Sequence, residues 1–378
     1  MSESRTRPAK IRHVPTGLYA KARLFNATPR FWRWLARVES AVLKDETAAI
    51  ELTRPIYIAG VARSGTTILT EILARHPDLA SHFYADFPNV YTPFWRHWLA
   101  ERLPGTPATA VERAHKDRLM ITAESPEAVE EVIWMQFFDR LHDSGECQVL
   151  DASTDNPAFE GFYRDHLRKL LLARGRKRYL TKGNYNTTRL AYIQKLFPDA
   201  RFVVPVRNPV NHVASLVKQD RLFLENSAQD PRVPHQLRMS GHYEFGPDKA
   251  CIHTGDDAVA EAVHAHWRAG RLVHGWALYW NTVYATVLDQ IEADPALKKA
   301  VMLLRYEDLC SKSHETVSRL VEHCRLPAAP FESIAKDYAG RLTEPDYYRP
   351  NFSAEEYRFV VESTADTAQR LGYDQPTE

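Results

Sequence analysis

The fold of this chain is decided by the stretch PIYIAGVARSGTTILTEIL, residues 55–73 of 378. It opens on an apolar run that is typical of a buried β-strand. Glycines at positions 60 and 65 then predict a tight turn, and from Thr66 the apolar residues recur at helical spacing. A strand that turns directly into a helix aims several backbone N–H groups and the positive helix end at one point. The stretch therefore predicts an anion-binding loop.

The loop has the glycine spacing of a P-loop but lacks its lysine. A Lys follows the second glycine in that pattern, whereas Thr66 stands there in this chain. The P-loop lysine reaches the terminal phosphates in nucleoside triphosphatases. The cation of this loop is Arg63, two residues before Gly65. The simpler alternative is a glycine-rich turn that binds no phosphate.

Further apolar runs place the loop in a larger architecture. Short β-rich runs at residues 178–182, 201–206 and 300–305 alternate with helical stretches. They predict an α/β fold, a P-loop-type three-layer sandwich with a central parallel β-sheet flanked by helices. Helices are expected at 184–197 and 208–220, and a helix or helix pair at 258–291. Residues 221–257 contain several Pro and Gly and predict an irregular insertion or lid.

Domain organisation and composition narrow the class of protein. Residues 1–50 are expected to form a helical arm and residues 51–378 one large domain. The aromatic stretch 31–43 in the arm either packs on the domain or lies on a membrane surface, and no apolar run is long enough to span a membrane. Basic and acidic residues number 49 and 48, which argues against nucleic-acid binding. Four widely spaced cysteines fit reduced thiols and a cytoplasmic location.

A second motif, YIQKLFPDARFVVPVRNPVNHVAS at residues 192–215, completes the anion site. Here a strand ends at Arg207, and Asn208 with Pro209 begins the next helix, since Pro is favoured in the first helical turn. Ser215 lies two turns along that helix. Because parallel strands end at one edge of the sheet, Arg207 is expected beside the first loop.

Together these motifs resemble those of the sulfotransferase family. Its common form of the first loop is a strand followed by Pro-Arg/Lys-Ser-Gly-Thr-Thr, and Ala62 stands where the family often has Pro. The motif FPxAxFV before an Arg is also typical. The elements RYEDL at 305–309 and FSAEE to LGY at 352–373 extend the resemblance over residues 54–373.

The resemblance implies how the donor 3′-phosphoadenosine 5′-phosphosulfate (PAPS) is bound. Arg63, Ser64, Gly65, Thr66 and Thr67 are then expected to bind the 5′-phosphosulfate. By the same resemblance, Arg207 and Ser215 are ligands of the 3′-phosphate. In the RYEDL element, Glu307 or Asp308 is expected to cap the following helix.

Candidate catalytic residues follow from position and from the resemblance. Lys182 ends the strand 178–182 and is expected to stabilise the leaving phosphate together with Arg63; it resembles a family lysine, although Gly183 and Asn184 depart from the family's next residues. The segment HPDLASHFYADFP, residues 76–88, offers Asp86 or His82 as the base that deprotonates the acceptor. The alternative for Asp86 is a structural role in the Phe87-Pro88 turn.

The predicted reaction is in-line transfer of a sulfuryl group, without a metal, to a hydroxyl or amine of a small-molecule, carbohydrate or lipid acceptor. No third ligand accompanies His264 and His266, so no metal site is expected. Four aromatics, Tyr91, Trp95, Trp98 and Trp134, either line an acceptor pocket or pack in the core. The alternatives are a P-loop small-molecule kinase that uses ATP and a non-catalytic nucleotide-binding module. The patterns carry no prediction of oligomeric state.

Overall fold

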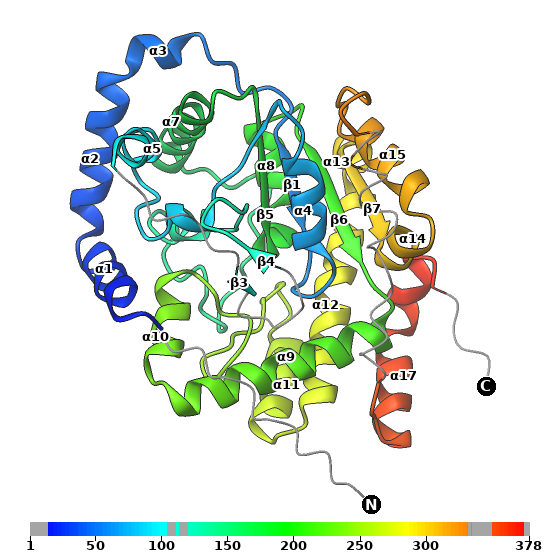
Figure 1. Cartoon of the computed structure of the whole chain (residues 1–378). Helices are drawn as coiled ribbons and strands as arrows, with labels where there is room; N and C mark the ends of the chain where they lie inside the picture. Colours follow the sequence, from blue (N-terminus) through cyan, green and yellow to red (C-terminus); the bar gives the residue numbers. More distant parts are fainter. Residues whose placement is uncertain (1–13, 104–110, 113–119, 332–333, 335–349, 374–378) are drawn as a thin grey trace, which may run out of the picture.

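The computed structural model of the chain describes residues 14–103, 111–112, 120–331, 334 and 350–373. Within these residues, its centre is a five-stranded parallel sheet in the order β2-β5-β1-β6-β7 (Figure 1). The strands of this sheet are β1 (Ile56–Ala59), β2 (Leu79–Ala80), β5 (Arg178–Gly183), β6 (Arg201–Val206) and β7 (Val301–Arg305). A separate antiparallel pair is formed by β3 (Val111–Glu112) and β4 (Met120–Ile121).

Helices precede, connect and follow these strands. In chain order they are α1 (Thr16–Ala27), α2 (Pro29–Val42), α3 (Lys44–Ala48), α4 (Thr66–Ala74), η1 (Tyr84–Asp86), α5 (Pro93–Arg102), α6 (Glu131–Trp134), α7 (Pro157–Arg174), η2 (Asn184–Thr188), α8 (Leu190–Leu196), α9 (Pro209–Gln229), α10 (Arg232–Met239), α11 (Asp257–Arg268), α12 (Leu272–Ala293), α13 (Pro295–Ala300), α14 (Tyr306–Ser311), α15 (Ser313–His323) and α17 (Ala354–Arg370).

The central strand β1 separates two apolar cores. Successive side chains of a strand point to opposite faces: Ile56 and Ile58 pack with apolar residues of α4 and α15. Tyr57 packs on the other face with residues of α7 and α12. Helices therefore cover both faces of the sheet, which confirms the predicted three-layer α/β fold.

Asparagine caps fix the start of the two helices that matter most for the site. Asn156 accepts a hydrogen bond from Phe159 N at 3.0 Å and begins α7. Asn208 accepts from Val210 N at 3.1 Å and begins α9, with Pro209 in the first helical position. Such caps satisfy N–H groups that have no partner within the helix.

The structure differs from the sequence predictions in two segments. The helix expected at 184–197 is divided into η2 and α8. The segment 221–257 is not irregular throughout, because α9 continues to Gln229 and α10 follows. Phe223 explains the longer α9, since its side chain is buried and extends the apolar face of the helix. The described part of residues 1–50 is helical, and the division into an arm and a domain stays a prediction.

Candidate active site

The phosphate loop links β1 to α4 with two residues in the left-handed region. Gly65 has φ 107° and Arg63 has φ 73°. A Cβ on Gly65 would lie 2.8 Å from Cδ2 of Tyr306, so only glycine fits this position. The loop therefore brings the N-terminus of α4 against α14 and leaves the first N–H groups of α4 at the carboxyl edge of the sheet.

Lys182 on β5 lies beside this loop. It pairs in register with Ile58 of β1, and its Nζ donates to Oγ1 of Thr67 at 3.0 Å. The same Nζ forms an ion pair with Oε1 of Glu127 at 2.8 Å. We call Thr67, Glu127 and Lys182 the edge cluster. In this cluster the ammonium group of Lys182 lies beside the N-terminus of α4, which attracts anions.

The second motif meets the first in space. Arg63 Nε donates to Oγ of the buried Ser215 at 3.4 Å, which links the loop to α9. Arg207 follows β6, and its guanidinium lies 5.3 Å from the centre of the Tyr306 ring. Tyr306 thus contacts Arg207 and closes over Gly65. The structure brings together the residues that the two motifs assign to opposite ends of one nucleotide.

His212 supports the loop from α9, and the sequence prediction missed it. Trp280 Nε1 donates to Nδ1 of His212 at 3.1 Å, so the imidazole donates from Nε2 to the carbonyl of Ala62 at 2.8 Å. Burial lowers the pKa of His212 to about 3, although the hydrogen bond to Ala62 opposes that shift. A neutral imidazole is therefore part of the loop's support.

Glu307 has a different role from the helix cap that was expected. Its Oε1 accepts from the backbone N of Asn208 at 2.9 Å, and its Oε2 accepts from Tyr373 Oη at 2.8 Å. Asp308 pairs with Arg305 at 3.0 Å, and α14 has no side-chain N-cap. Glu307 therefore braces the turn between Arg207 and α9 rather than its own helix.

Asp86 lies in a cluster of cations. Its two oxygens accept from Nη2 of Arg174, each at 3.0 Å, and it forms a second ion pair with Arg96. His82 Nδ1 lies 3.1 Å from Asp86 Oδ2, and the backbone N of Phe83 donates to that oxygen at 2.8 Å. We call His82, Asp86, Arg96 and Arg174 the buried cluster. The bond from Phe83 gives Asp86 a local, structural role at the start of η1, and not in the Phe87-Pro88 turn that was the expected alternative.

The buried cluster keeps Asp86 ionised. Burial raises the pKa of the carboxyl, but the hydrogen bond and charge of His82 and the charges of Arg174 and Arg96 outweigh burial and hold the pKa well below its usual range. His82 Nε2 in turn lies 3.0 Å from Nε2 of His166. Both ring nitrogens of His82 thus have protein partners, which disfavours either residue as a base.

The segment after α10 folds back onto the end of β5. Gly241 has φ 74°, and a Cβ there would lie 2.7 Å from Cγ of Glu131, so glycine is required for this approach. Tyr243 N then donates to Tyr185 Oη at 2.9 Å. Glu244 accepts from Asn184 Nδ2 at 2.7 Å. These contacts place the segment against the residues that directly follow Lys182.

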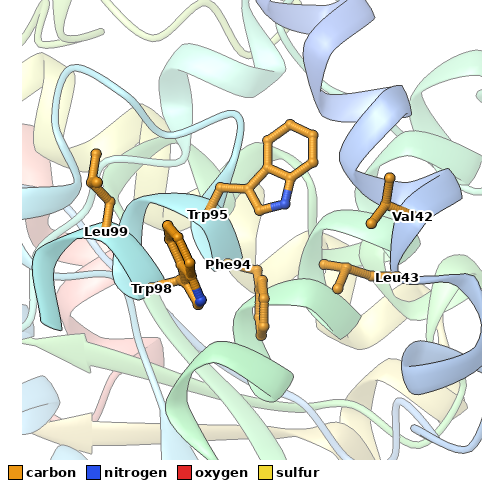
Figure 2. A pocket seen from close by; sticks show the side chains of 6 residues that line it. All are labelled: Val42, Leu43, Phe94, Trp95, Trp98 and Leu99. Atoms are coloured by element: carbon orange, nitrogen blue, oxygen red, sulfur yellow. The ribbon is translucent and has the colours of Figure 1, made fainter. Parts of the chain in front are cut away.

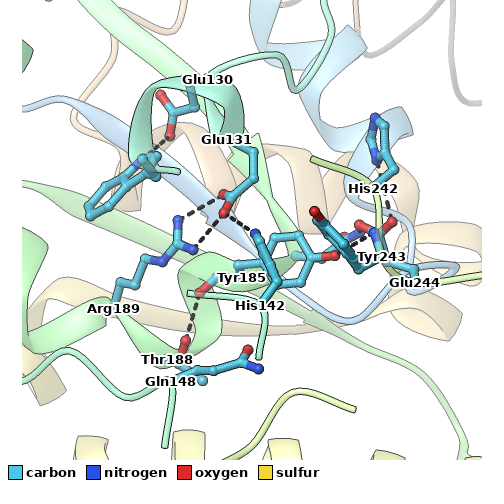
Figure 3. Close-up of polar contacts among 12 residues, drawn as sticks. Glu130, Glu131, His142, Gln148, Tyr185, Thr188, Arg189, His242, Tyr243 and Glu244 are labelled. Atoms are coloured by element: carbon cyan, nitrogen blue, oxygen red, sulfur yellow. Dashed lines mark hydrogen bonds and ion pairs between the residues drawn. The ribbon is translucent and has the colours of Figure 1, made fainter. Parts of the chain in front are cut away.

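His242 is a half-buried member of this segment. Its Nδ1 lies 3.3 Å from Oε2 of Glu244, and 36% of the side chain is accessible, against 8% for Glu244 (Figure 3). Burial is the largest single effect and lowers the pKa of His242, but the charge and hydrogen bond of Glu244 and the charge of Glu127 together outweigh it and raise the pKa; Lys182 opposes the rise. The electrostatic field of the edge cluster thus reaches His242.

The residue that Gly241 packs against, Glu131, belongs to a buried ion pair. Arg189 donates to both oxygens of Glu131, at 2.7 and 2.8 Å, and His142 Nε2 lies 2.7 Å from Oε1 (Figure 3). Burial raises the pKa of Glu131, but Arg189 and His142 outweigh it and lower the pKa to about 2. Glu131 is therefore an ionised structural group.

Sequence reasoning missed Glu127, His212, His242 and Glu244. His212 stands inside the second motif, so its position was a signal that could have been used. Glu127 and His242 stand in segments with no strand or helix pattern, and only long-range contacts place them.

Two other observations concern the described residues. No group of three or more His, Cys, Asp or Glu among them is arranged to hold a metal ion. Nor is any helix in that part of the chain long and apolar enough to cross a membrane.

Comparisons with known proteins agree with the fold and the motifs. The model of a sulfotransferase family matches residues 55–243. The structure is similar to sulfotransferase STF9 from Mycobacterium avium, with a TM-score of 0.52, 14% identity and coverage of 90% of this chain and 83% of that chain. The structure is also similar to sulfotransferase STF1 from Mycobacterium tuberculosis H37Rv, with a TM-score of 0.45 and 16% identity. That match covers 93% of this chain and 90% of that chain. Comparison with curated proteins gives no match.

Proposed function

Because this chain belongs to the sulfotransferase family and is a sulfotransferase enzyme, we propose that it uses PAPS as donor and sulfates a hydroxyl or amine of a small-molecule, carbohydrate or lipid acceptor. The observation that carries the proposal is the hydrogen bond between Arg63 and Ser215. It joins a loop suited to one phosphate group to a helix that follows Arg207, so one ligand with phosphates at both ends fits both motifs.

The donor would be held at its two ends. The loop residues Arg63, Ser64, Gly65, Thr66 and Thr67 would bind the 5′-phosphosulfate, and Arg207 and Ser215 the 3′-phosphate. N–H groups of a helix start and a guanidinium are strong partners for phosphate oxygens. The chain has no P-loop lysine at position 66, which disfavours the alternative of an ATP-dependent kinase.

During transfer, the acceptor oxygen or nitrogen forms a bond to sulfur while the bond from sulfur to the 5′-phosphate oxygen breaks. Negative charge develops on that bridging oxygen. Lys182 contacts Thr67 and so lies where it can stabilise this charge, with Arg63 as the second cation.

For the base we favour His242 over the candidates Asp86 and His82. His242 is partly exposed, is paired with Glu244, and lies within the field of Glu127 and Lys182. In the neutral form it would take the proton of the acceptor, and Glu244 would stabilise the imidazolium that results.

The location is also part of the proposal. The cysteines Cys147, Cys251, Cys310 and Cys324 are free thiols. Thiols persist in a reducing compartment, which supports a cytoplasmic enzyme.

The proposal is tested by calorimetric titration with 3′-phosphoadenosine 5′-phosphate, with ATP as the comparison ligand and no added metal. Arg207→Ala should weaken binding about ten- to a hundredfold, since a charge-assisted hydrogen bond contributes about 1.5–3 kcal/mol. Arg201→Ala, at the opposite end of β6, is the matched control and should bind normally. Magnesium-dependent binding of ATP in place of the bisphosphate would favour the kinase.

A further inference from the structure

The helix α2 has an inner face that is firmly anchored. Ala36 and Glu39 are fully buried, and Glu39 forms an ion pair with Lys169 of α7 at 2.9 Å. Lys169 also donates to the carbonyl of Ala36 at 2.8 Å, and Arg33 donates to the carbonyl of Gln136 at 2.9 Å. This face fixes how α2 is rotated on the domain.

The outer face of α2 is apolar although it faces outward. Phe31 is 50% exposed, Trp34 54% and Val42 61%. Positions 31, 34 and 42 fall on one stripe of a helix. The stripe is thus half-exposed, while Ala36 and Glu39 on the anchored side of the same helix are buried.

A second helix extends the same apolar surface. Glu39 Oε1 accepts from the backbone N of Trp95 at 2.7 Å, which locks α5 beside α2. On α5 and just after it, Trp98 is 45% exposed, Leu99 49% and Leu103 57%. Between the two helices lies an open cavity of about 430 Å³, which is lined by Val42, Leu43, Phe94, Trp95, Trp98 and Leu99 (Figure 2).

The charges around this surface are mostly positive. The exposed charged residues of α1, α2, α3 and α5 are six cations and three carboxylates, namely Lys21, Arg23, Arg30, Arg37, Lys44, Arg102, Asp45, Glu46 and Glu101. The whole chain, by contrast, has 49 basic and 48 acidic residues. Arg102 lies over the ring of Trp98, with its guanidinium carbon 4.1 Å from the ring centre. Cations are therefore concentrated around the exposed aromatic side chains.

We propose that the surface formed by Phe31, Trp34, Val42, Trp98, Leu99 and Leu103 docks the enzyme onto an anionic lipid bilayer. Helices that lie on membranes combine exposed Trp, Phe and Leu with Lys and Arg at their borders. The aromatic rings enter the headgroup region while the cations meet anionic lipids, as at a cytoplasmic leaflet. A symmetric dimer through this face would instead bring the cations of two copies together. The inference concerns membrane binding and does not depend on the donor or the acceptor.

The test is sedimentation of the full chain with vesicles. Binding is expected to vesicles of equal parts phosphatidylcholine and phosphatidylglycerol, to weaken as salt is raised, and to be much lower with phosphatidylcholine alone. The double variant Phe31→Ser/Trp34→Ser should reduce the bound fraction about tenfold. Arg30→Glu/Arg37→Glu should remove the preference for the anionic lipid. The control Tyr357→Ser changes an exposed aromatic on α17 and should bind like the wild type.

The same proteins are examined by sedimentation velocity without lipid and by circular dichroism. A folded double variant that still binds vesicles like the wild type would overturn the proposal. So would failure of the wild type to bind, or a dimer that the double variant abolishes, because the face would then join two copies of the chain.

Discussion

The edge cluster and the buried cluster both pair a carboxylate with cations, yet they use the carboxylate in different ways. They adjoin, since the backbone N of Glu127 donates to the carbonyl of His82 at 2.9 Å. In the buried cluster both oxygens of Asp86 accept from Arg174, and Arg96 adds a second guanidinium. In the edge cluster Lys182 bridges a carboxylate and the Thr67 hydroxyl of the phosphate loop. The oxygens of Asp86 are thus occupied by cations within the buried cluster, whereas Lys182 connects a carboxylate to the phosphate loop.

The largest effect is expected from a substitution that breaks the buried cluster. Asp86→Asn leaves Arg174 and Arg96 buried without a counter-charge and should lower the free energy of unfolding by about 3–5 kcal/mol. Urea denaturation measures this loss, and the turnover of the folded fraction should change little. If turnover instead fell by a factor of about 10²–10⁴ while stability was kept, Asp86 would be the base after all.

The second largest effect is expected from a substitution that removes Lys182, the cation of the edge cluster. Lys182→Met should lower kcat about 10²–10³-fold, because one donor to a developing oxyanion is lost. The free energy of unfolding should also fall, because Glu127 loses its partner in a largely buried ion pair, so kcat is measured on the folded fraction. The surface variant Lys195→Met on α8 is the control and should keep normal turnover; equal losses in the two variants would count against the assignment.

A smaller effect is expected at the base. His242→Asn should lower kcat about a hundredfold. Glu244 raises the pKa of His242, and a base acts above its pKa, so Glu244→Gln should move the acidic limb of the pH–rate profile to lower pH. An unchanged profile in Glu244→Gln would assign the base to another group.

The smallest effect concerns pH and the support of the loop. The pKa of His212 is about 3 in the fold and 6.5 as its ordinary value, so the unfolded chain binds the additional proton between these limits. The stability from the neutral imidazole is fully present above pH 6.5 and is lost as pH falls, by up to about 1.4 kcal/mol per pH unit. His212→Asn should flatten this slope in urea titrations from pH 6.5 to about pH 5, before carboxylates such as Glu131 titrate.

The sheet could be predicted because its signal is local. The β6 run at 201–206 is apolar and bounded by polar residues, and the structure has the strand over those residues. The two sequence motifs could be recognised for the same reason, since each stands in a continuous stretch. Arg63 and Ser215 lie 152 residues apart, yet the parallel sheet places both motifs at one edge.

The contacts of Asp86 could not be predicted because one of its partners is remote in the sequence. Asp86 is near the first loop in sequence, which suggested a base, but Arg174 stands 88 residues later and occupies both oxygens. The position of His242 could not be predicted for a related reason. Its position depends on the fit between Gly241 and Glu131, more than a hundred residues earlier in the chain, and a polar segment carries no pattern that reveals such a contact.

The brace at Glu307 has a consequence for how the protein is made. Glu307 stands 99 residues after Asn208, and Tyr373 a further 66 residues on. During synthesis on the ribosome, the phosphate loop and the Arg207 turn emerge long before Tyr373 can engage Glu307. The nascent chain therefore has both sequence motifs before it has the hydrogen bond from Tyr373 to Glu307. The turn that carries Arg207 is therefore fully braced only after the last described helix of the chain has been made.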